Sequence, residues 1–190
     1  MSCLALTLDD GPDERFTPRL LDLLGEAGAR ATFFPIAPRA QQHPDLVSRI
    51  IAEGHGVGVH CQEHVRHSTR DEAWGCRDAD LSLQCLRELG ADPQLWRTPW
   101  GDLAPWTQRV AAQRNLRIVG WDVDTHDWRG DDATDMFAAT RAGLVGGAVV
   151  LAHDGIGPGA QRCGCEETLA YVRLVVEHAR ATGLTLEALT

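Results

Sequence analysis

Short apolar runs and longer amphipathic stretches alternate along the chain. Residues 4–8 form the first run, in which four of five side chains are apolar, and this predicts a buried strand. Further apolar runs predict strands at about residues 31–36, 56–59, 95–96, 116–121, 148–152 and 184–189. Apolar side chains at helical spacing predict helices at about residues 17–27, 45–53, 71–89, 107–114, 133–142 and 166–181.

The order of these elements bounds the fold. Strands that alternate with helices are typical of an α/β fold, and we expect a distorted parallel (β/α) barrel or sheet of about seven strands. A chain of 190 residues can bury one core, so we expect a single domain over residues 1–190. Ser68 or Thr69 is the expected N-cap of the long helix at 71–89.

Polar side chains follow five of the predicted strands, at the point where each strand ends. They are Asp9 with Asp10, His60, Arg97, the acidic segment 122–127, and His153. The carboxyl ends of parallel strands lie on one face of such a fold, which is where α/β proteins keep their sites. We therefore expect these side chains to share one site.

Composition excludes several classes of function. The net charge of −9 argues against a nucleic-acid partner. All 18 basic residues are arginine, which excludes a lysine Schiff base and a P-loop lysine. No apolar run is long enough to cross a membrane, and no basic leader precedes the first strand, so we expect a cytoplasmic location. The six cysteines fit no zinc-finger spacing and are expected to be free thiols.

Two acidic and two histidine side chains suggest a metal site. Asp9 and Asp10 stand where a strand turns into a loop, so one carboxylate can bind a cation while the other acts as a base. His60 and His64 would lie on one face of a helical turn, four residues apart. With Asp10 they form a set that leaves an open position, as catalytic zinc does, and that also suits cobalt or another divalent metal. Taken separately, each pair is also common as a surface or capping feature.

Three later residues have chemistry suited to the same site. Arg97 can hold a carboxylate in its ionised form, although a purely structural bridge to an aspartate is the alternative. His153 ends an apolar strand and suits a general acid, with Asp127 as the carboxylate that orients it. A histidine in such a place is otherwise a satisfied core residue. Trp121 and Trp128 lie beside the acidic segment and could as easily belong to the core, which is the usual place of a lone tryptophan.

Five segments, in this order, resemble the motifs of the polysaccharide deacetylases of carbohydrate esterase family four, the NodB-homology domain. Residues 7–12 read Thr-Leu-Asp-Asp-Gly-Pro, where the family has Thr-Phe-Asp-Asp-Gly-Pro. Residues 60–64 match His-Ser/Thr-x-x-His, and residues 97–101 match Arg-Pro-Pro-Tyr-Gly. Residues 124–128 match Asp-x-x-Asp-Trp, and residues 151–153 match Leu-x-His. The resemblance spans nearly the whole chain.

The resemblance implies a role for each matched residue. It assigns Asp9 as the base, steadied by Arg97, and His153 as the acid, tuned by Asp127. The implied metal ligands are Asp10, His60 and His64. On the substrate side, the backbone N–H of Trp100 helps to hold the oxyanion, Leu151 lines the acetyl pocket, and Trp128 completes the fourth motif.

The chain departs from the family pattern at four positions. Leu8 changes only packing, and Thr98 in place of proline loosens the third motif. Cys61 replaces a hydroxyl residue that braces the histidine segment, and a thiol is a weaker hydrogen-bonding group. Trp100 replaces tyrosine, which keeps the backbone donor and removes a hydroxyl from the substrate groove.

These observations lead us to expect a zinc-type hydrolase that removes acetyl groups from N-acetylated sugars such as chitin oligomers or peptidoglycan. One alternative on the same scaffold is an esterase for O-acetylated glycans, and another is an amidohydrolase for a small nitrogen compound. An alternative of another class is a glycan-binding member without activity. The residues leave open which acetylated substrate is used and the oligomeric state.

Overall fold

The computed structural model describes residues 2–190 and is built around one central strand. This strand, β1 (Ser2–Asp9), is buried along its carboxyl half. It pairs in parallel with β2 (Thr32–Phe34), β7 (Val149–His153) and β8 (Leu184–Leu186). Consecutive residues of its carboxyl half are buried, so both faces of the strand are covered, which explains why its apolar residues do not alternate with polar ones.

The other strands extend this sheet on both sides. Their order is β3-β2-β1-β7-β6, with β3 at Gly56–Val57 and β6 at Val123–Asp124. A second small sheet joins β4 (Leu95–Trp96) to β5 (Arg117–Ile118). An isolated parallel bridge between Val59 and Trp96 connects the two sheets. All the strand pairs are parallel, so the predicted distorted (β/α) barrel is confirmed.

The strand predicted at 116–121 is shorter than expected, because only β5 forms in this segment, and it pairs with β4. The next strand, β6, begins after the predicted segment and pairs with β7. Between them, the carbonyls of Val119 and Gly120 accept hydrogen bonds from the Arg97 side chain at 3.4 and 2.9 Å instead of from a neighbouring strand. The described residues consequently contain eight strands rather than about seven.

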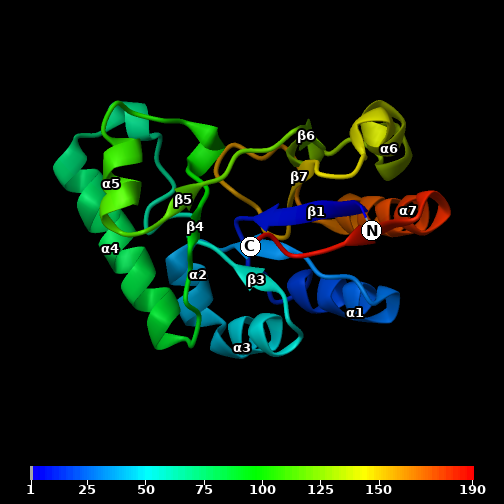
Figure 1. Cartoon of the computed structure of the whole chain (residues 1–190), viewed down its shortest axis with the longest axis horizontal. Helices are drawn as coiled ribbons and strands as arrows, with labels where there is room; N and C mark the ends of the chain where they lie inside the picture. The colour runs from blue at the N-terminus through cyan, green and yellow to red at the C-terminus, as the bar shows by residue number, and fades with distance from the viewer. Residues whose placement is uncertain (1) are drawn as a thin grey trace.

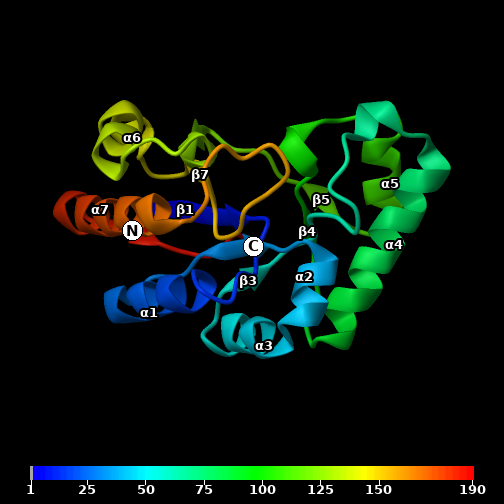
Figure 2. The ribbon, with the colours of Figure 1, turned by 180° about the vertical axis from the view of Figure 1, so that it is seen from behind.

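The helices surround the strands, and Figures 1 and 2 show one group of helices at each end of the molecule, with α2 and α3 between them. Helices α1 (Thr17–Ala27), α6 (Ala133–Thr140) and α7 (Glu166–Thr182) lie at the end that contains β1 and β7. Helices α4 (Glu72–Glu88) and α5 (Thr107–Gln113) lie at the opposite end, beside β4 and β5. Each group covers its own buried apolar cluster. No helix among residues 2–190 has the length and apolarity needed to cross a bilayer.

Two helical features differ from the prediction. A short helix, α2 (Ala37–Gln42), precedes α3 (Pro44–Ala52) where no helix was expected. The N-cap of α4 is Asp71, whose carboxylate accepts a hydrogen bond from the backbone N–H of Trp74 at 2.8 Å. Ser68 lies earlier, in a single 3₁₀ turn, and bonds to Asp102. An aspartate satisfies the free N–H groups of the first turn as well as a hydroxyl does. Asp71 directly precedes the helix and therefore takes the N-cap position.

Candidate active site

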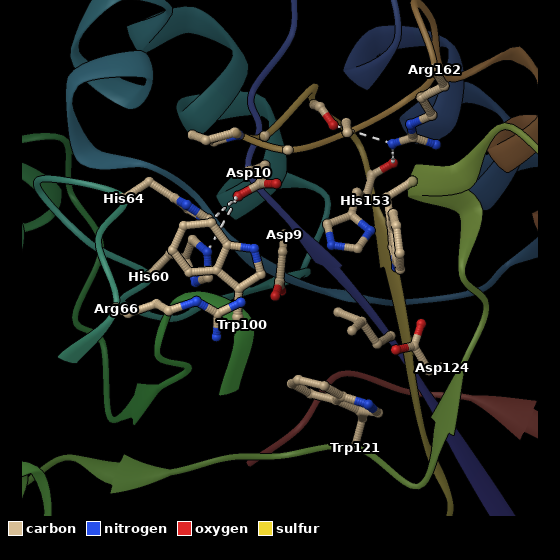
Figure 3. A pocket seen from close by; sticks show the side chains of 17 residues that line it. Asp9, Asp10, His60, His64, Arg66, Trp100, Trp121, Asp124, His153 and Arg162 are labelled. Carbon is tan, nitrogen blue, oxygen red and sulfur yellow. Dashed lines mark hydrogen bonds and ion pairs between the residues drawn. The ribbon is translucent and has the colours of Figure 1, made fainter. Parts of the chain in front are cut away.

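Most of the polar residues that follow the strands line one cavity of about 430 Å³, which lies within the size range of small-molecule sites (Figure 3). Arg97 and Asp127 do not line it and contact residues that do. Its floor contains the carboxyl ends of β1 and β7, where Asp9 lies in register with His153. The segment after β3 contributes His60 and His64, and the loop after β7 contributes Arg162. Side chains from distant parts of the sequence therefore meet at one end of the barrel.

The acidic pair reaches the cavity because the strand ends between its two members. Asp9 is the last residue of β1, and Asp10 has a left-handed backbone with φ of 72°. This turn lets adjacent side chains face the same space, which a continuing strand would prevent. The Arg39 guanidinium holds the turn by donating a hydrogen bond to the Asp10 carbonyl at 2.7 Å.

Asp10, His60 and His64 form a three-residue cluster with their ligand atoms within 4.8 Å of one another. The Asp10 Oδ1 atom lies 3.3 Å from His60 Nε2 and 3.2 Å from His64 Nε2. Asp10 Oδ1 and His60 Nε2 are buried and have no hydrogen-bond partner within residues 2–190. His60 Nδ1 bonds the Arg97 carbonyl at 2.7 Å, which leaves Nε2 to face the cluster. These donors fit a divalent cation of the zinc type.

Charge within the cluster supports the same interpretation. Burial raises the pKa of Asp10, but the imidazoles of His60 and His64 outweigh it and hold the pKa well below its usual value. Burial lowers the pKa of His60, whereas Asp10 and Asp9 raise it, and the net effect is a raised pKa. The pocket is therefore arranged so that positive charge beside Asp10 is favourable.

The segment from His60 to His64 is not the helical turn that the spacing suggested. It is an irregular loop, and a side chain of α4 holds it by hydrogen bonds. The Asp78 carboxylate accepts hydrogen bonds from the backbone N–H groups of Gln62 and Glu63 at 3.1 and 2.7 Å. Burial raises the Asp78 pKa to about 6 despite these bonds. The bracing expected to be weak at Cys61 therefore comes from a carboxylate on another element.

Arg97 lies beneath the acidic pair and is fully buried. Its Nη1 atom donates to Asp9 Oδ1 at 3.0 Å and to Thr7 Oγ1 at 2.6 Å. The remaining guanidinium donors reach backbone carbonyls of the segment between β5 and β6. These hydrogen bonds immobilise the Arg97 guanidinium, which in turn holds the Asp9 carboxylate in a fixed orientation at the cavity.

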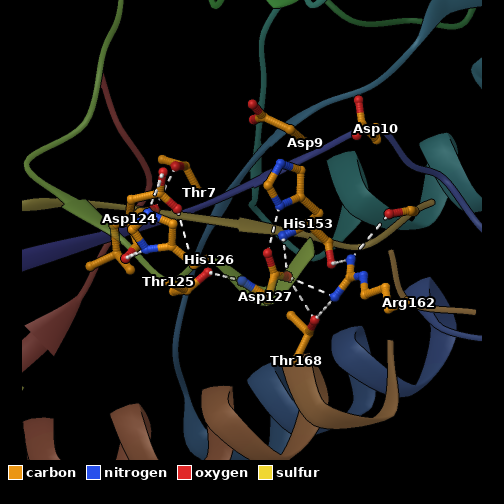
Figure 4. Close-up of polar contacts among 12 residues, drawn as sticks. Thr7, Asp9, Asp10, Asp124, Thr125, His126, Asp127, His153, Arg162 and Thr168 are labelled. Atoms are coloured by element: carbon orange, nitrogen blue, oxygen red, sulfur yellow. Dashed lines mark hydrogen bonds and ion pairs between the residues drawn. The ribbon is translucent and has the colours of Figure 1, made fainter. Parts of the chain in front are cut away.

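Asp127 and His153 form a second buried pair (Figure 4). His153 Nδ1 lies 2.7 Å from Asp127 Oδ1, and the backbone N–H of His153 donates to Asp127 Oδ2 at 3.0 Å. Burial lowers the pKa of His153, but the charge and hydrogen bond of Asp127, aided by Asp9 and Asp10, raise it to about 9. Burial raises the pKa of Asp127, while His153 and Arg162 bring it down to about 2. The imidazole is therefore held protonated at neutral pH, with Nε2 toward the cavity.

Arg162 is a part of this network that the sequence analysis missed. It donates to Asp127 Oδ2 at 2.9 Å and to the His153 carbonyl at 3.1 Å, and it contacts Thr168. Thr168, in the first turn of α7, donates to the same carboxylate oxygen at 2.7 Å. Neither residue has periodicity or a motif to mark it. The one available signal was a basic residue in the Gly-rich loop that follows His153.

Aromatic and apolar side chains form the walls. Trp100 has φ of 56° and is 41% exposed, with its ring edge-on to His64 at a centroid distance of 4.2 Å. Leu151 is buried and contributes to the lining. Trp121 and Trp128 also line the cavity and are only partly buried, so of the two places left open for them the structure gives them the cavity wall and not the core.

Two histidines near the cluster in sequence are structural. His55 accepts a hydrogen bond from the Ala31 N–H, and burial lowers its pKa. His67 stacks on Trp106 at 4.9 Å, and burial lowers its pKa to about 4. Both are therefore neutral at physiological pH and do not line the cavity.

Comparisons with known proteins agree with this geometry. A family model described as polysaccharide deacetylase matches residues 1–119. A peptidoglycan-N-acetylglucosamine deacetylase of Bacillus cereus is 35% identical over 151 residues, which cover 79% of this chain and 55% of that protein. A chitooligosaccharide deacetylase of Bradyrhizobium is 35% identical over 162 residues, covering 83% of this chain and 73% of that protein.

The fold comparison gives the same result. The structure of a family 4 carbohydrate esterase from Streptomyces lividans, in complex with acetate, superposes with a TM-score of 0.88 at 29% identity, over 100% of this chain and 93% of that one. The chain spans about half the length of the Bacillus cereus relative, 55%, so the comparison concerns the part that they share. The family model alone covers more than half of the chain, from residue 1 to residue 119. The chain belongs to the polysaccharide deacetylase family.

Proposed function

We propose that this protein is a metal-dependent hydrolase that removes acetyl groups from N-acetylated sugars in a glycan or oligosaccharide. The observation that carries the proposal is the meeting of Asp10, His60 and His64 with two further proton-transfer groups in one cavity. Relatives named as deacetylases of peptidoglycan N-acetylglucosamine and of chitooligosaccharides support this substrate class.

Asp10, His60 and His64 are the residues that would hold the metal ion, with zinc as the first choice and cobalt as an alternative. When bound, such an ion supplies Lewis acidity, which lowers the pKa of water and polarises a carbonyl group. The chain places its own proton-transfer groups around that position. The set of one carboxylate and two imidazoles leaves room for substrate, as catalytic sites require.

Asp9 is the proposed base. Arg97 orients its carboxylate. Asp9 also directly precedes Asp10, which belongs to the proposed metal cluster. As water attacks the acetyl carbonyl carbon, Asp9 accepts the proton that the water loses. The backbone N–H of Trp100 is the proposed donor to the oxygen on which negative charge develops. Leu151 offers an apolar wall for the methyl group of the acetyl.

His153 is the proposed acid. Its raised pKa, about 9, keeps the ring protonated at neutral pH, and Asp127 holds Nδ1 so that Nε2 can donate. The amine of the sugar takes this proton as its bond to the carbonyl carbon breaks, and acetate is released. Trp100 and Trp128 offer ring faces for the sugar, since aromatic side chains provide apolar contact area with a fixed geometry.

Acetate release from matched substrates tests this proposal. The panel consists of chito-oligosaccharides, peptidoglycan fragments and acetylated xylan, assayed with metal-stripped protein and again after zinc or cobalt is restored. We expect metal-dependent release from an N-acetylated sugar, and a loss of about 10²-fold or more in the Asp9→Asn variant. Asp45→Asn, an exposed position on α3, is the control. Full activity of Asp9→Asn with metal bound would contradict the assigned roles.

The same panel separates the alternatives. Release from acetylated xylan alone would indicate an esterase for O-acetyl groups. Metal binding with no release from any glycan would favour an amidohydrolase for a small nitrogen compound. Binding of glycans without turnover, in protein that has bound metal, would favour a non-catalytic glycan-binding protein.

A further inference from the structure

The cavity contains one basic side chain whose charge has no described partner. Arg66 and Arg162 are the arginines that line it. Arg162 is 5% exposed at its side chain and donates to Asp127, Thr168 and two backbone carbonyls. The Arg66 guanidinium makes no hydrogen bond or ion pair with any residue in 2–190 and is exposed at the cavity mouth. Its charge is therefore available to a ligand.

Arg66 is nevertheless held in place. Its guanidinium carbon lies 4.6 Å from the centroid of the Trp100 ring, a cation–π arrangement, and Figure 3 shows the two side chains together. Trp100 in turn contacts the His64 ring. The contact with the ring leaves the N–H donors along the guanidinium edge without a hydrogen-bond partner among residues 2–190. Such an edge is preorganised for a ligand one side chain away from the metal cluster.

The chemistry of that edge favours a carboxylate. The planar fork of N–H donors matches two carboxylate oxygens, and such paired bonds between two ionised groups are stronger and more specific in geometry than a single bond to a neutral hydroxyl. The surroundings oppose anions otherwise, because the chain has a net charge of −9 and the cavity contains Asp9, Asp10 and Asp124. The cavity as a whole repels anions, so an anionic group would bind only at the Arg66 guanidinium. The binding position of such a group is therefore specific.

We propose that Arg66, supported by Trp100, is a carboxylate-binding subsite, and that the preferred substrates are N-acetylated sugars in a glycan that also carries a carboxylate. This proposal rests on the proposed deacetylase function and names its substrate class. The carboxylate can belong to an ether-linked side group of an amino sugar or to a uronic acid ring. Both present the same chemistry to a guanidinium.

Substrates that differ only in charge test the proposal. In the first pair, a disaccharide of N-acetylglucosamine with N-acetylmuramic acid is compared with its own methyl ester. In the second pair, a disaccharide of N-acetylglucosamine with a uronic acid is compared with its own methyl ester. The readout is the ratio of kcat/KM for acid over ester, with metal-loaded protein. We expect Arg66→Gln to lower this ratio by about tenfold for at least one pair, and high salt to lower it in the unchanged protein. The pair that responds identifies the source of the carboxylate.

Arg70→Gln is the matched control. Arg70 is exposed in the same segment and also lies over a tryptophan, Trp74, at 5.7 Å, but it does not line the cavity. It is expected to leave the ratio unchanged. If Arg66→Gln lowers kcat/KM equally for acid and ester, Arg66 only braces Trp100, and the proposed subsite is wrong.

Calorimetric binding of the same acid and ester separates this proposal from the proposed function. If no disaccharide releases acetate, the deacetylase proposal fails for these substrates, and binding becomes the readout. Tighter binding of the acid that is lost in Arg66→Gln and kept in Arg70→Gln supports the subsite. Equal binding of acid and ester, or no binding of either, overturns it.

Discussion

Replacement of Asp127 by asparagine tests how the cavity keeps His153 protonated. The pKa of His153 is raised from 6.5 to about 9, which corresponds to about 3 kcal/mol of interaction in favour of the protonated ring. Asp127 is the largest contributor to this rise, through its charge and its 2.7 Å hydrogen bond. In Asp127→Asn the negative charge is lost and the hydrogen bond is weakened. Burial continues to oppose protonation of the ring, so we expect the pKa of His153 to fall to about 6.5 or below.

The sign of the pH dependence follows from that shift. A raised histidine pKa favours the protonated ring until the pH rises through the folded-state value, about 9. A cation bound at Asp10 would offset part of the contribution from Asp9 and Asp10, so the metal-loaded protein loses activity somewhat below that pH. At pH 7.5 the native ring is still mostly protonated, whereas a ring with a pKa of about 6.5 is about 10% protonated. Together with lost orientation, this predicts a fall in kcat/KM of about 10²-fold to 10³-fold.

The assay is acetate release from a chito-oligosaccharide between pH 5.5 and pH 10, with zinc bound. The deficit of Asp127→Asn is expected to shrink as the pH falls toward 6, because low pH restores the proton. Asp135→Asn is the control, since Asp135 is exposed on neighbouring α6. A deficit that is the same at pH 6 and pH 8, with an unchanged alkaline limb, would refute the reasoning and leave Asp127 with a positioning role alone.

Three further outcomes are expected from other parts of the site. Asp78→Ala removes the carboxylate that holds the loop from His60 to His64 and should weaken zinc binding by about 10-fold to 100-fold in calorimetry, with an unchanged circular dichroism spectrum. Equal zinc affinity would show that the loop is rigid without Asp78. Arg162→Gln leaves part of the buried Asp127 charge without a partner and should lower the free energy of unfolding by about 3 kcal/mol in urea, whereas a loss below about 0.5 kcal/mol would contradict this. Zinc at 100 times its dissociation constant should stabilise the protein by about 3 kcal/mol in thermal unfolding, and Asp10→Asn should abolish most of that gain; an equal gain in both would place the metal elsewhere.

The alternation of strands and helices could be read from the sequence because burial leaves a local pattern. The run that became β1 is apolar on both faces, and the leucines of α1 repeat at helical spacing before Gly28 ends the helix with φ of 64°. The five segments that resemble the deacetylase motifs were also visible, since each depends on a few adjacent residues. Their meeting at one end of the barrel was inferable because parallel strands end on the same face.

Tertiary structure decided which partner each segment meets. The segment 116–121 looked like one strand, but β5 ends at Ile118, and the carbonyls of the next two residues accept hydrogen bonds from the buried Arg97 guanidinium. The histidine segment was expected to be helical and is a loop, because hydrogen bonds from its backbone to Asp78 replace those of a helix.

The same limit applies to the residues found only in the folded molecule. Arg162 reaches Asp127 across 35 positions of sequence, and Arg66 contacts Trp100 from a different segment, with α4 and β4 between them in the chain. Hydrophobic periodicity reports whether a side chain is buried, whereas a buried ion pair or a cation–π contact depends on where two distant segments cross. The sequence by itself therefore determined the elements and the chemistry available at their ends. The tertiary structure alone decided which charges are neutralised and which one is left for a ligand.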